Sequence, residues 1–165
     1  RAPAGVRGGG GGSALVVFGG VTMREPAVPL GLGPDGDPLQ VPVATDALLV
    51  YDLPRGAKGA WRTPDLSGAP PRGRYRHAAC VLGEHMVVSG GTVVEPHPTA
   101  AHPWPVSRPT DELFVLGLNS LQWAEISPSG VPLPMRAGHS LTPVGDETII
   151  ILGGYTIDDG GAGAA

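Results

Sequence analysis

An internal repeat is the feature that most constrains the fold of this 165-residue chain. A short apolar run that ends in two glycines occurs three times, as LVVFGG at 15–20, MVVSGG at 86–91 and IIILGG at 149–154. A second motif occurs twice, as TDALLVYDL at 45–53 and TDELFVLGL at 110–118. Copies that keep one order predict a structural unit repeated along the chain.

A segment that runs from a tryptophan to a histidine fixes the register between two copies. His77 follows Trp61 by 16 positions, and His139 follows Trp123 by the same 16. Residues inside the segment also match, namely Ser67-Gly68 with Ser129-Gly130, Pro70 with Pro132, and Arg74 with Arg136. So many matches in one register exclude chance similarity and establish a repeat.

Each copy predicts four β-strands. The strand runs are rich in Val, Ile, Leu and Phe, and turn-forming residues stand between them, in a chain with 27 Gly and 19 Pro. The first strand is HAACVL or HSLTPV, the second ends in the glycine pair, the third begins at TD and the fourth at LQW. VVSGG and IIILGG are uninterrupted apolar runs, which predicts burial on both faces. Four-stranded sheets stacked in a β-propeller supply such burial.

On these residues the chain resembles the kelch-repeat family. The resemblance rests on the glycine doublets, on Tyr51 and the two tryptophans, and on the pattern P-x-x-x-R-x-x-H at 70–77 and 132–139. The chain departs from the family where Leu116 replaces the tyrosine, and where the copies exceed the usual period of about 50 residues. The resemblance implies an all-β fold, a partial kelch β-propeller of about two to three four-stranded blades.

The repeat also predicts how the chain is divided, with the kelch repeats at 14–155. The divisions are a Gly-rich linker or cut end at 1–13, a partial blade at 14–66, a full blade at 67–128, a partial blade at 129–155 and a Gly/Ala-rich tail at 156–165. Because propellers close with about four to eight blades, we expect a fragment of a larger kelch protein, whose further blades would cover two open, apolar sheet faces. The alternative is a truncated chain without a stable fold.

Charge and cysteine content limit the classes of partner. The net charge is −4 at pH 7 and the pI is about 5.6, which gives no electrostatic reason to expect nucleic acid or an anionic membrane surface. No apolar run approaches the roughly 20 residues of a membrane helix. A single cysteine and the absence of a signal-peptide pattern predict a cytoplasmic location.

The stretch RYRHAACVLGEHMVVSGG at 74–91 invites a catalytic interpretation that its geometry disfavours. His77 and Cys80 stand three apart in an extended strand, so their side chains point to opposite faces and cannot form a nucleophile–base pair. His85 is expected beside Leu82, and Thr142 replaces the cysteine in the third copy. A buried structural cysteine is therefore predicted.

The glycine doublets and the two tryptophans also have structural interpretations. The doublets lack the G-x-G-x-x-G and GK[ST] patterns of phosphate-binding loops. Their predicted role is to end a buried strand, where a positive φ or a close backbone excludes a Cβ. Trp61 and Trp123 are predicted to pack between blades.

Two long loops, 21–44 and 92–109, are the best candidates for a binding surface. Both join the second and third strands of a blade, so they should lie side by side on one rim. Prolines stiffen the second loop, and a tryptophan beside an arginine is typical of interaction hot spots. The alternative is an insertion without structure or function. The residues predicted to bind are Arg24, Glu25, His97, His102, Trp104 and Arg108 in the loops, and Arg74 and Arg136 before the first strands.

Two alternatives accompany these binding residues. Arg74 and Arg136 recur with the repeat, which favours a structural role in binding backbone carbonyls over contact with an acidic ligand. His97 and His102 have only Glu95 as a further ligand at suitable spacing, so no metal is predicted.

The sequence thus predicts a non-catalytic protein–protein interaction module, a scaffold or adaptor that needs no cofactor. The resemblance implies a protein partner, because kelch propellers serve as adaptors, scaffolds and regulatory domains. The alternative is part of a kelch-type propeller enzyme, or the regulatory domain of a larger enzyme such as a phosphatase or copper oxidase. A copper oxidase needs Tyr, His and Cys ligands that converge, whereas Tyr51, Tyr75 and Tyr155 lie on separate segments.

Overall fold

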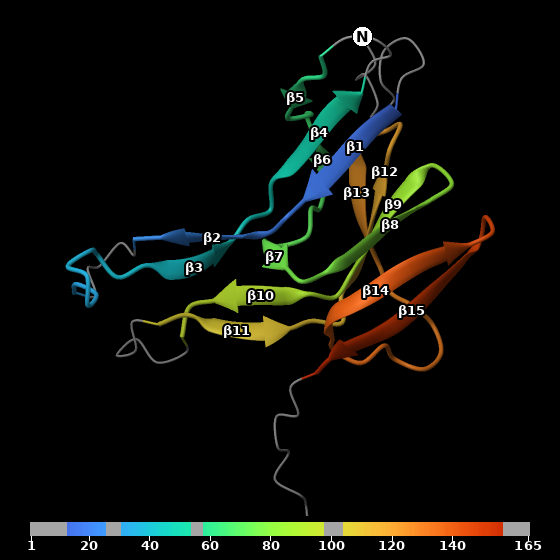
Figure 1. Cartoon of the computed structure of the whole chain (residues 1–165). Coiled ribbons are helices and arrows are strands. Elements are labelled where there is room, and N and C mark those ends of the chain that lie inside the picture. The colour runs from blue at the N-terminus through green and yellow to red at the C-terminus, as the bar shows by residue number, and fades with distance from the viewer. Residues whose placement is uncertain (1–12, 26–30, 54–57, 98–103, 157–165) are drawn as a thin grey trace, which may run out of the picture.

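The computed structural model describes residues 13–25, 31–53, 58–97 and 104–156 (Figure 1). Within these ranges the chain forms fifteen strands and no helix. The strands of the three blade sheets are β1 (Ser13–Phe18), β4 (Leu48–Leu53), β5 (Trp61–Arg62), β6 (Ser67–Gly68), β8 (Ala78–Leu82), β9 (His85–Ser89), β12 (Leu113–Gly117), β13 (Gln122–Ile126), β14 (Ala137–Val144) and β15 (Thr148–Tyr155). The remaining strands are β2 (Val21–Arg24), β3 (Val41–Ala44), β7 (Arg74–Tyr75), β10 (Thr92–Glu95) and β11 (Val106–Pro109).

Strands β8, β9, β12 and β13 form one complete four-stranded blade. They pair antiparallel in chain order, and the short strand β6 adds parallel to β13 at the outer edge. Gly83, at a φ of +56°, turns the chain from β8 into β9, so that His85 pairs with Leu82. The four strands predicted for the middle copy are confirmed.

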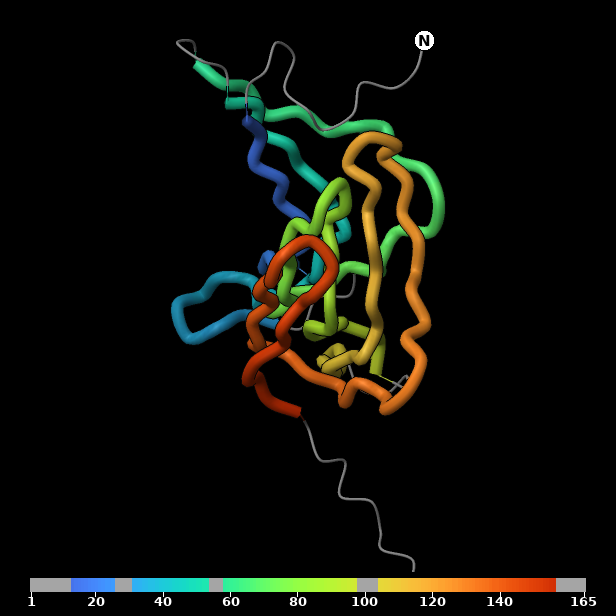
Figure 2. Tube along the Cα trace, turned by 90° about the vertical axis from the view of Figure 1, so that its right-hand side faces the viewer, coloured from blue at the N-terminus to red at the C-terminus, as the bar shows by residue number. Residues whose placement is uncertain are grey.

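The flanking sheets are parts of two further blades. β1, β4 and β5 correspond to the second, third and fourth strands of a blade, whereas β14 and β15 correspond to the first and second. The sheets follow one another in Figure 1, and Figure 2 shows the β14–β15 hairpin beside the β8–β9 hairpin, which β14 contacts. The predicted all-β, partial kelch β-propeller is confirmed.

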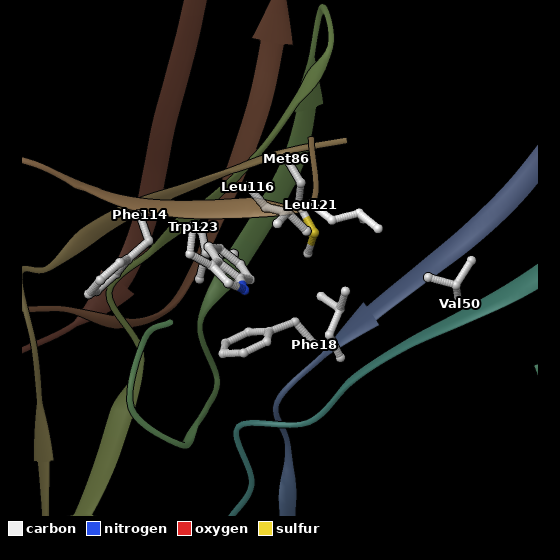
Figure 3. Close-up of a cluster of buried hydrophobic side chains, with 9 residues drawn as sticks. Phe18, Val50, Met86, Phe114, Leu116, Leu121 and Trp123 are labelled. Atoms are coloured by element: carbon white, nitrogen blue, oxygen red, sulfur yellow. The ribbon is translucent and has the colours of Figure 1, made fainter. Parts of the chain in front are cut away.

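The hydrophobic core lies between the first sheet and the complete blade. Phe18 points from β1 toward Trp123, and the two ring centroids are 5.3 Å apart (Figure 3). Such an aromatic pair contributes about 0.5–1.5 kcal/mol beyond its buried area. The buried core cluster comprises Phe18, Leu48, Val50, Met86, Val88, Phe114, Leu116, Leu121 and Trp123.

Two predictions of burial differ from the structure at the outer sheets. Met86–Ser89 are buried, as MVVSGG predicts, but Ile150 and Leu152 of IIILGG are exposed, because no further sheet covers the outer side of β15 within the described residues. Trp123 packs between two blades as predicted. Trp61 does not, because no sheet of the described residues covers it; it packs on the Tyr51 ring, 5.0 Å between centroids, and remains exposed.

Candidate interaction surface

Each of the first two glycine doublets lies in close contact with the backbone of the next blade and donates a hydrogen bond to it. A Cβ on Gly19, whose φ is +70°, would lie 2.6 Å from the carbonyl oxygen of Arg74, and that oxygen accepts a hydrogen bond from the Gly20 amide. Gly90–Gly91 repeat the arrangement with the carbonyl of Arg136, whose oxygen would again lie 2.6 Å from a Cβ on Gly90. The predicted close approach of a neighbouring backbone is confirmed at both junctions.

After each of these doublets the chain leaves the blade and forms a two-stranded hairpin. The first hairpin is β2–β3 and the second is β10–β11, with β7 paired to the other edge of β10. Both project to the same side in Figure 1, and β3 contacts β10. The prediction that the two loops lie side by side is confirmed. An insertion without structure is wrong for their described parts, which are paired strands.

The hairpins carry most of the residues predicted to bind. Arg24 ends β2 and is exposed, as is Glu25 directly after it. Trp104 precedes β11 and is 47% exposed, and Arg108 on β11 is also exposed. His97 is half-buried after β10, and the sixth loop residue, His102, lies outside the described residues. The structure therefore places Trp104 and Arg108 on one hairpin, and Arg24 and Glu25 on the other.

Arg74 lies at the base of the second hairpin and is fully buried. Its Nε donates to the carbonyl of Arg72 (3.1 Å), and its Nη1 donates to the carbonyl of Gly90 (3.0 Å). Arg136 has the same kind of partners, the carbonyls of Pro134 and Gly153. The structural interpretation of these arginines, as donors to backbone carbonyls, is confirmed; a contact of either with a ligand stays a prediction.

A network of charged side chains joins the second hairpin to the complete blade. Arg72 donates to Glu95 of β10 and, over 3.1 Å, to Glu112 before β12; Glu112 also accepts from Arg74. Burial alone would raise the pKa of Glu112, but its hydrogen bond to Arg74 and the nearby positive charges lower it below the usual value. The hydrogen bond to Glu95 raises the pKa of Arg72. Arg72 and Glu112 are therefore both charged at neutral pH.

Arg72 and Glu112 were not among the residues that the sequence predicted to bind. Both depart from the repeat, because Pro134 and Ala47 occupy the equivalent positions in the other copies. That departure is the signal that could have found them. Because the other copies fold with uncharged residues at these positions, the blade fold itself does not require Arg72 or Glu112.

A cavity of about 290 Å³ opens between the second hairpin and the segment that leads to β14. Arg72, Glu95 and Glu112 of the network lie in its wall, and Val93 and Met135 add apolar surface. The lining residues are Arg72, Val93, Glu95, Arg108, Pro109, Thr110, Asp111, Glu112 and Met135.

The stretch around Cys80 forms the β8–β9 hairpin of the complete blade. Cys80 is half-buried and pairs with Val87, while His85 stands opposite Leu82 near the turn. Burial raises the pKa of the Cys80 thiol, and burial together with the charge of Arg74 lowers the pKa of His77 to about 4. Among the described residues no group of three His, Cys, Asp or Glu side chains could hold a metal ion. The described residues also contain no helix that is long and apolar enough to cross a membrane.

Comparison with known proteins agrees with this architecture. Residues 9–161 match the KLHDC2/KLHL20/DRC7 Kelch-repeats domain. Kelch domain-containing protein 2 of Bos taurus is 31% identical over 98 residues, which are 59% of this chain and 21% of that protein. Rab9 effector protein with kelch motifs of Rattus norvegicus is 30% identical over 91 residues, 54% of this chain and 22% of that protein.

A plant relative has similar repeats in a protein named for another domain. Acyl-CoA-binding domain-containing protein 5 of Arabidopsis thaliana is 32% identical over 108 residues, 59% of this chain and 15% of that protein. The chain thus aligns with about a fifth or less of each of these relatives. With a family match along nearly its whole length and three sheets joined by glycine doublets, the chain belongs to the kelch-repeat family.

Proposed function

We propose that this chain is a non-catalytic protein-interaction segment of a larger kelch protein. Its contact surface consists of the rim hairpins within 21–44 and 92–109, and its partner is a protein. The observation that carries the proposal is the cavity beside β10–β11, whose wall holds Arg72 and Glu112, two charged residues absent from the repeat.

Two exposed side chains of the second hairpin support the same surface, and one of them, Arg108, lines the cavity. Trp104 and Arg108 belong to the residue types that dominate the energy of protein interfaces. The side chain of Arg108 makes no hydrogen bond or ion pair with the described residues, so its guanidinium can bind a carboxylate of a partner. Arg72 holds Glu95 in place, which preorganises the hairpin and lowers the entropy lost on binding.

The names of relatives point in the same direction. One is called a Rab9 effector protein, a name that relates it to another protein. For this chain a protein partner follows only as a proposal, because the match covers a small part of that relative.

Peptide selection tests the proposal without a known partner. A random-peptide phage library would be panned on the immobilised 165-residue chain, and the affinity of the selected peptides measured by calorimetry. We expect the double variant Trp104→Ala, Arg108→Ala to weaken binding about tenfold or more, as loss of two hot-spot side chains should. Trp61→Ala is the matched control, since Trp61 is 55% exposed and lies outside the rim.

The control separates the rim from the rest of the surface. Binding that is unchanged in the double variant would contradict the proposal. So would binding that Trp61→Ala weakens while the rim variant does not, because the peptides would then occupy the open face of the first sheet.

A further inference from the structure

Two charged side chains in the wall of the cavity beside β10–β11 have no partner among the described residues. They are Arg108 on β11 and Asp111, three positions later. Both are exposed, and neither side chain makes a hydrogen bond or ion pair with the described part of the chain. The remaining charges of the wall belong to the network, in which two arginines neutralise two glutamates. The cavity therefore presents one free positive and one free negative group.

The two free charges stand on a backbone that is hydrogen-bonded on both sides. Arg108 pairs with Val93 of β10, and the amide of Thr110 donates to the carbonyl of Gly91 (2.9 Å). The carbonyl of Thr110 accepts from the amide of Arg136 (3.2 Å), which joins the end of β11 to the segment that leads to β14 (Figure 1). Because this backbone is already fixed, little conformational freedom is lost when a partner binds the two charges.

The cavity exists because the second junction departs from the first. At the first junction the chain packs directly on backbone, since a Cβ on Gly73 would lie 2.5 Å from the carbonyl oxygen of Ala44. The repeat aligns these two residues with Met135 and Pro109, which line the cavity. Met135 has a side chain, which is 52% exposed, so its segment cannot approach β11 as closely. The lining residues belong to the complete blade or to the segments that join it to its neighbours, and both neighbouring sheets are present around it.

The surroundings of Asp111 make its end of the cavity the negative one. A second cavity, of about 250 Å³, shares Asp111 and Glu112 with the first and adds Glu125. Its lining residues in the described chain include no arginine or lysine. A partner that spans the first cavity therefore meets a positive charge at Arg108 and a negative potential around Asp111.

We propose that the cavity selects an extended peptide segment of the partner that has one acidic and one basic side chain, two residues apart. The acidic side chain pairs with Arg108 and the basic one with Asp111. The Cα atoms of Arg108 and Asp111 lie at most about 10 Å apart, since three residues span no more. Alternate side chains of an extended segment share one face at a spacing of about 7 Å, which fits within this limit. The inference rests on the proposed function, because it names the partner chemistry of the same surface.

Exchange of charges between chain and peptide tests this pairing. Peptides selected by phage display on the 165-residue chain should be enriched in such acid–base pairs relative to the unselected library. Asp111→Lys should weaken the binding of a selected peptide about tenfold or more in calorimetry, because the basic residue of the peptide then meets a like charge. The double variant Arg108→Glu, Asp111→Lys keeps the net charge of the chain. It should bind a peptide with its two charges exchanged about as tightly as the wild type binds the original peptide.

Asp46→Lys is the matched control for the change of charge. Asp46 has the place of Asp111 in the TD motif of the first copy and is exposed, but it does not line the cavity. Its replacement should leave the affinity unchanged. A second measurement avoids any change to the fold of the chain. Replacing the basic residue of the selected peptide with glutamate should weaken its binding to the wild-type chain about tenfold or more.

The outcomes separate this inference from the function on which it rests. Peptides whose binding is weakened by Trp104→Ala, Arg108→Ala, but which lack the acid–base pair or do not recover their affinity when the charges are exchanged, would overturn the inference alone. An equal loss of affinity in Asp46→Lys would do the same. Peptides whose binding that rim variant leaves unchanged, or a library from which no peptide is selected, would contradict the proposed function and the inference with it.

Discussion

Replacing Gly90 with alanine should disrupt the junction between the complete blade and the β14–β15 sheet. Gly90 has a φ of +57°, and a Cβ there would lie 2.6 Å from the Arg136 carbonyl oxygen and 2.9 Å from the His139 ring. Gly153 has the same place in the third copy and a φ of +75°, but a Cβ there would meet nothing within 4 Å. Gly153→Ala is therefore a matched control for backbone strain alone.

The structure separates the two contributions to the loss of stability. An alanine in the left-handed region costs about 1–2 kcal/mol, and both variants incur this cost. Forcing a methyl group into a packed backbone costs about 1–3 kcal/mol more, and only Gly90→Ala incurs it. We expect the free energy of unfolding to fall by about 2–5 kcal/mol for Gly90→Ala and by about 1–2 kcal/mol for Gly153→Ala.

Urea unfolding followed by circular dichroism measures both losses. Gly83→Ala provides a second control, because Gly83 has a φ of +56° and a Cβ there would meet only open space. Similar losses in all three variants would refute the reasoning, since they would show that the Arg136 carbonyl does not restrict position 90.

Three further perturbations test the core, the charged network and the buried histidine. Trp123→Ala should lower the free energy of unfolding by about 3–5 kcal/mol, whereas Trp61→Ala, at an exposed side chain, should cost less than about 1 kcal/mol in the same urea titrations. Arg74→Met should cost about 1–3 kcal/mol, because the Glu112 carboxylate loses one of its two arginine partners and the Gly90 carbonyl loses a donor, and the loss should shrink in a Glu112→Gln background. The pKa of His77 is about 4 in the native state, below the value near 6.5 of an unfolded histidine. The unfolded state therefore binds more protons in this window, so stability should fall as the pH drops from about 6.5 to about 4, and His77→Asn should reduce that fall.

The repeat was sufficient to predict the blades because aligning its copies shows which residues occupy equivalent positions in equivalent strands. Aligning Trp61 with Trp123 and His77 with His139 assigns every strand of the complete blade. The glycine doublets were predictable for a physical reason, since two adjacent glycines at the end of an apolar strand mark a backbone that something approaches closely.

Burial at the outer sheets could not be predicted from the same pattern. The side chains of an apolar strand are buried on both faces only when a neighbouring blade covers each face. No sheet of the described residues covers Leu152, which is therefore exposed. The hairpin strands were missed because β2 and β3 have only four residues each, among prolines and glycines that predict loops.

The charged network was missed because its members are distant in the sequence. Arg72 lies 23 positions from Glu95 and 40 from Glu112, and only the stacking of the blade beneath the hairpin brings the three together. Each alone has the character of an ordinary solvated surface residue.

Amide hydrogen exchange, read by NMR with and without a selected peptide, tests most directly that the rim hairpins are the contact surface. We predict that bound peptide slows exchange at Val93–Glu95 of β10 and Val106–Arg108 of β11. Amides at the opposite end of the blade, around Gly83 and Gly145, should not change. Slower exchange at those turns, with β10 and β11 unaffected, would contradict the assignment of the rim hairpins as the contact surface.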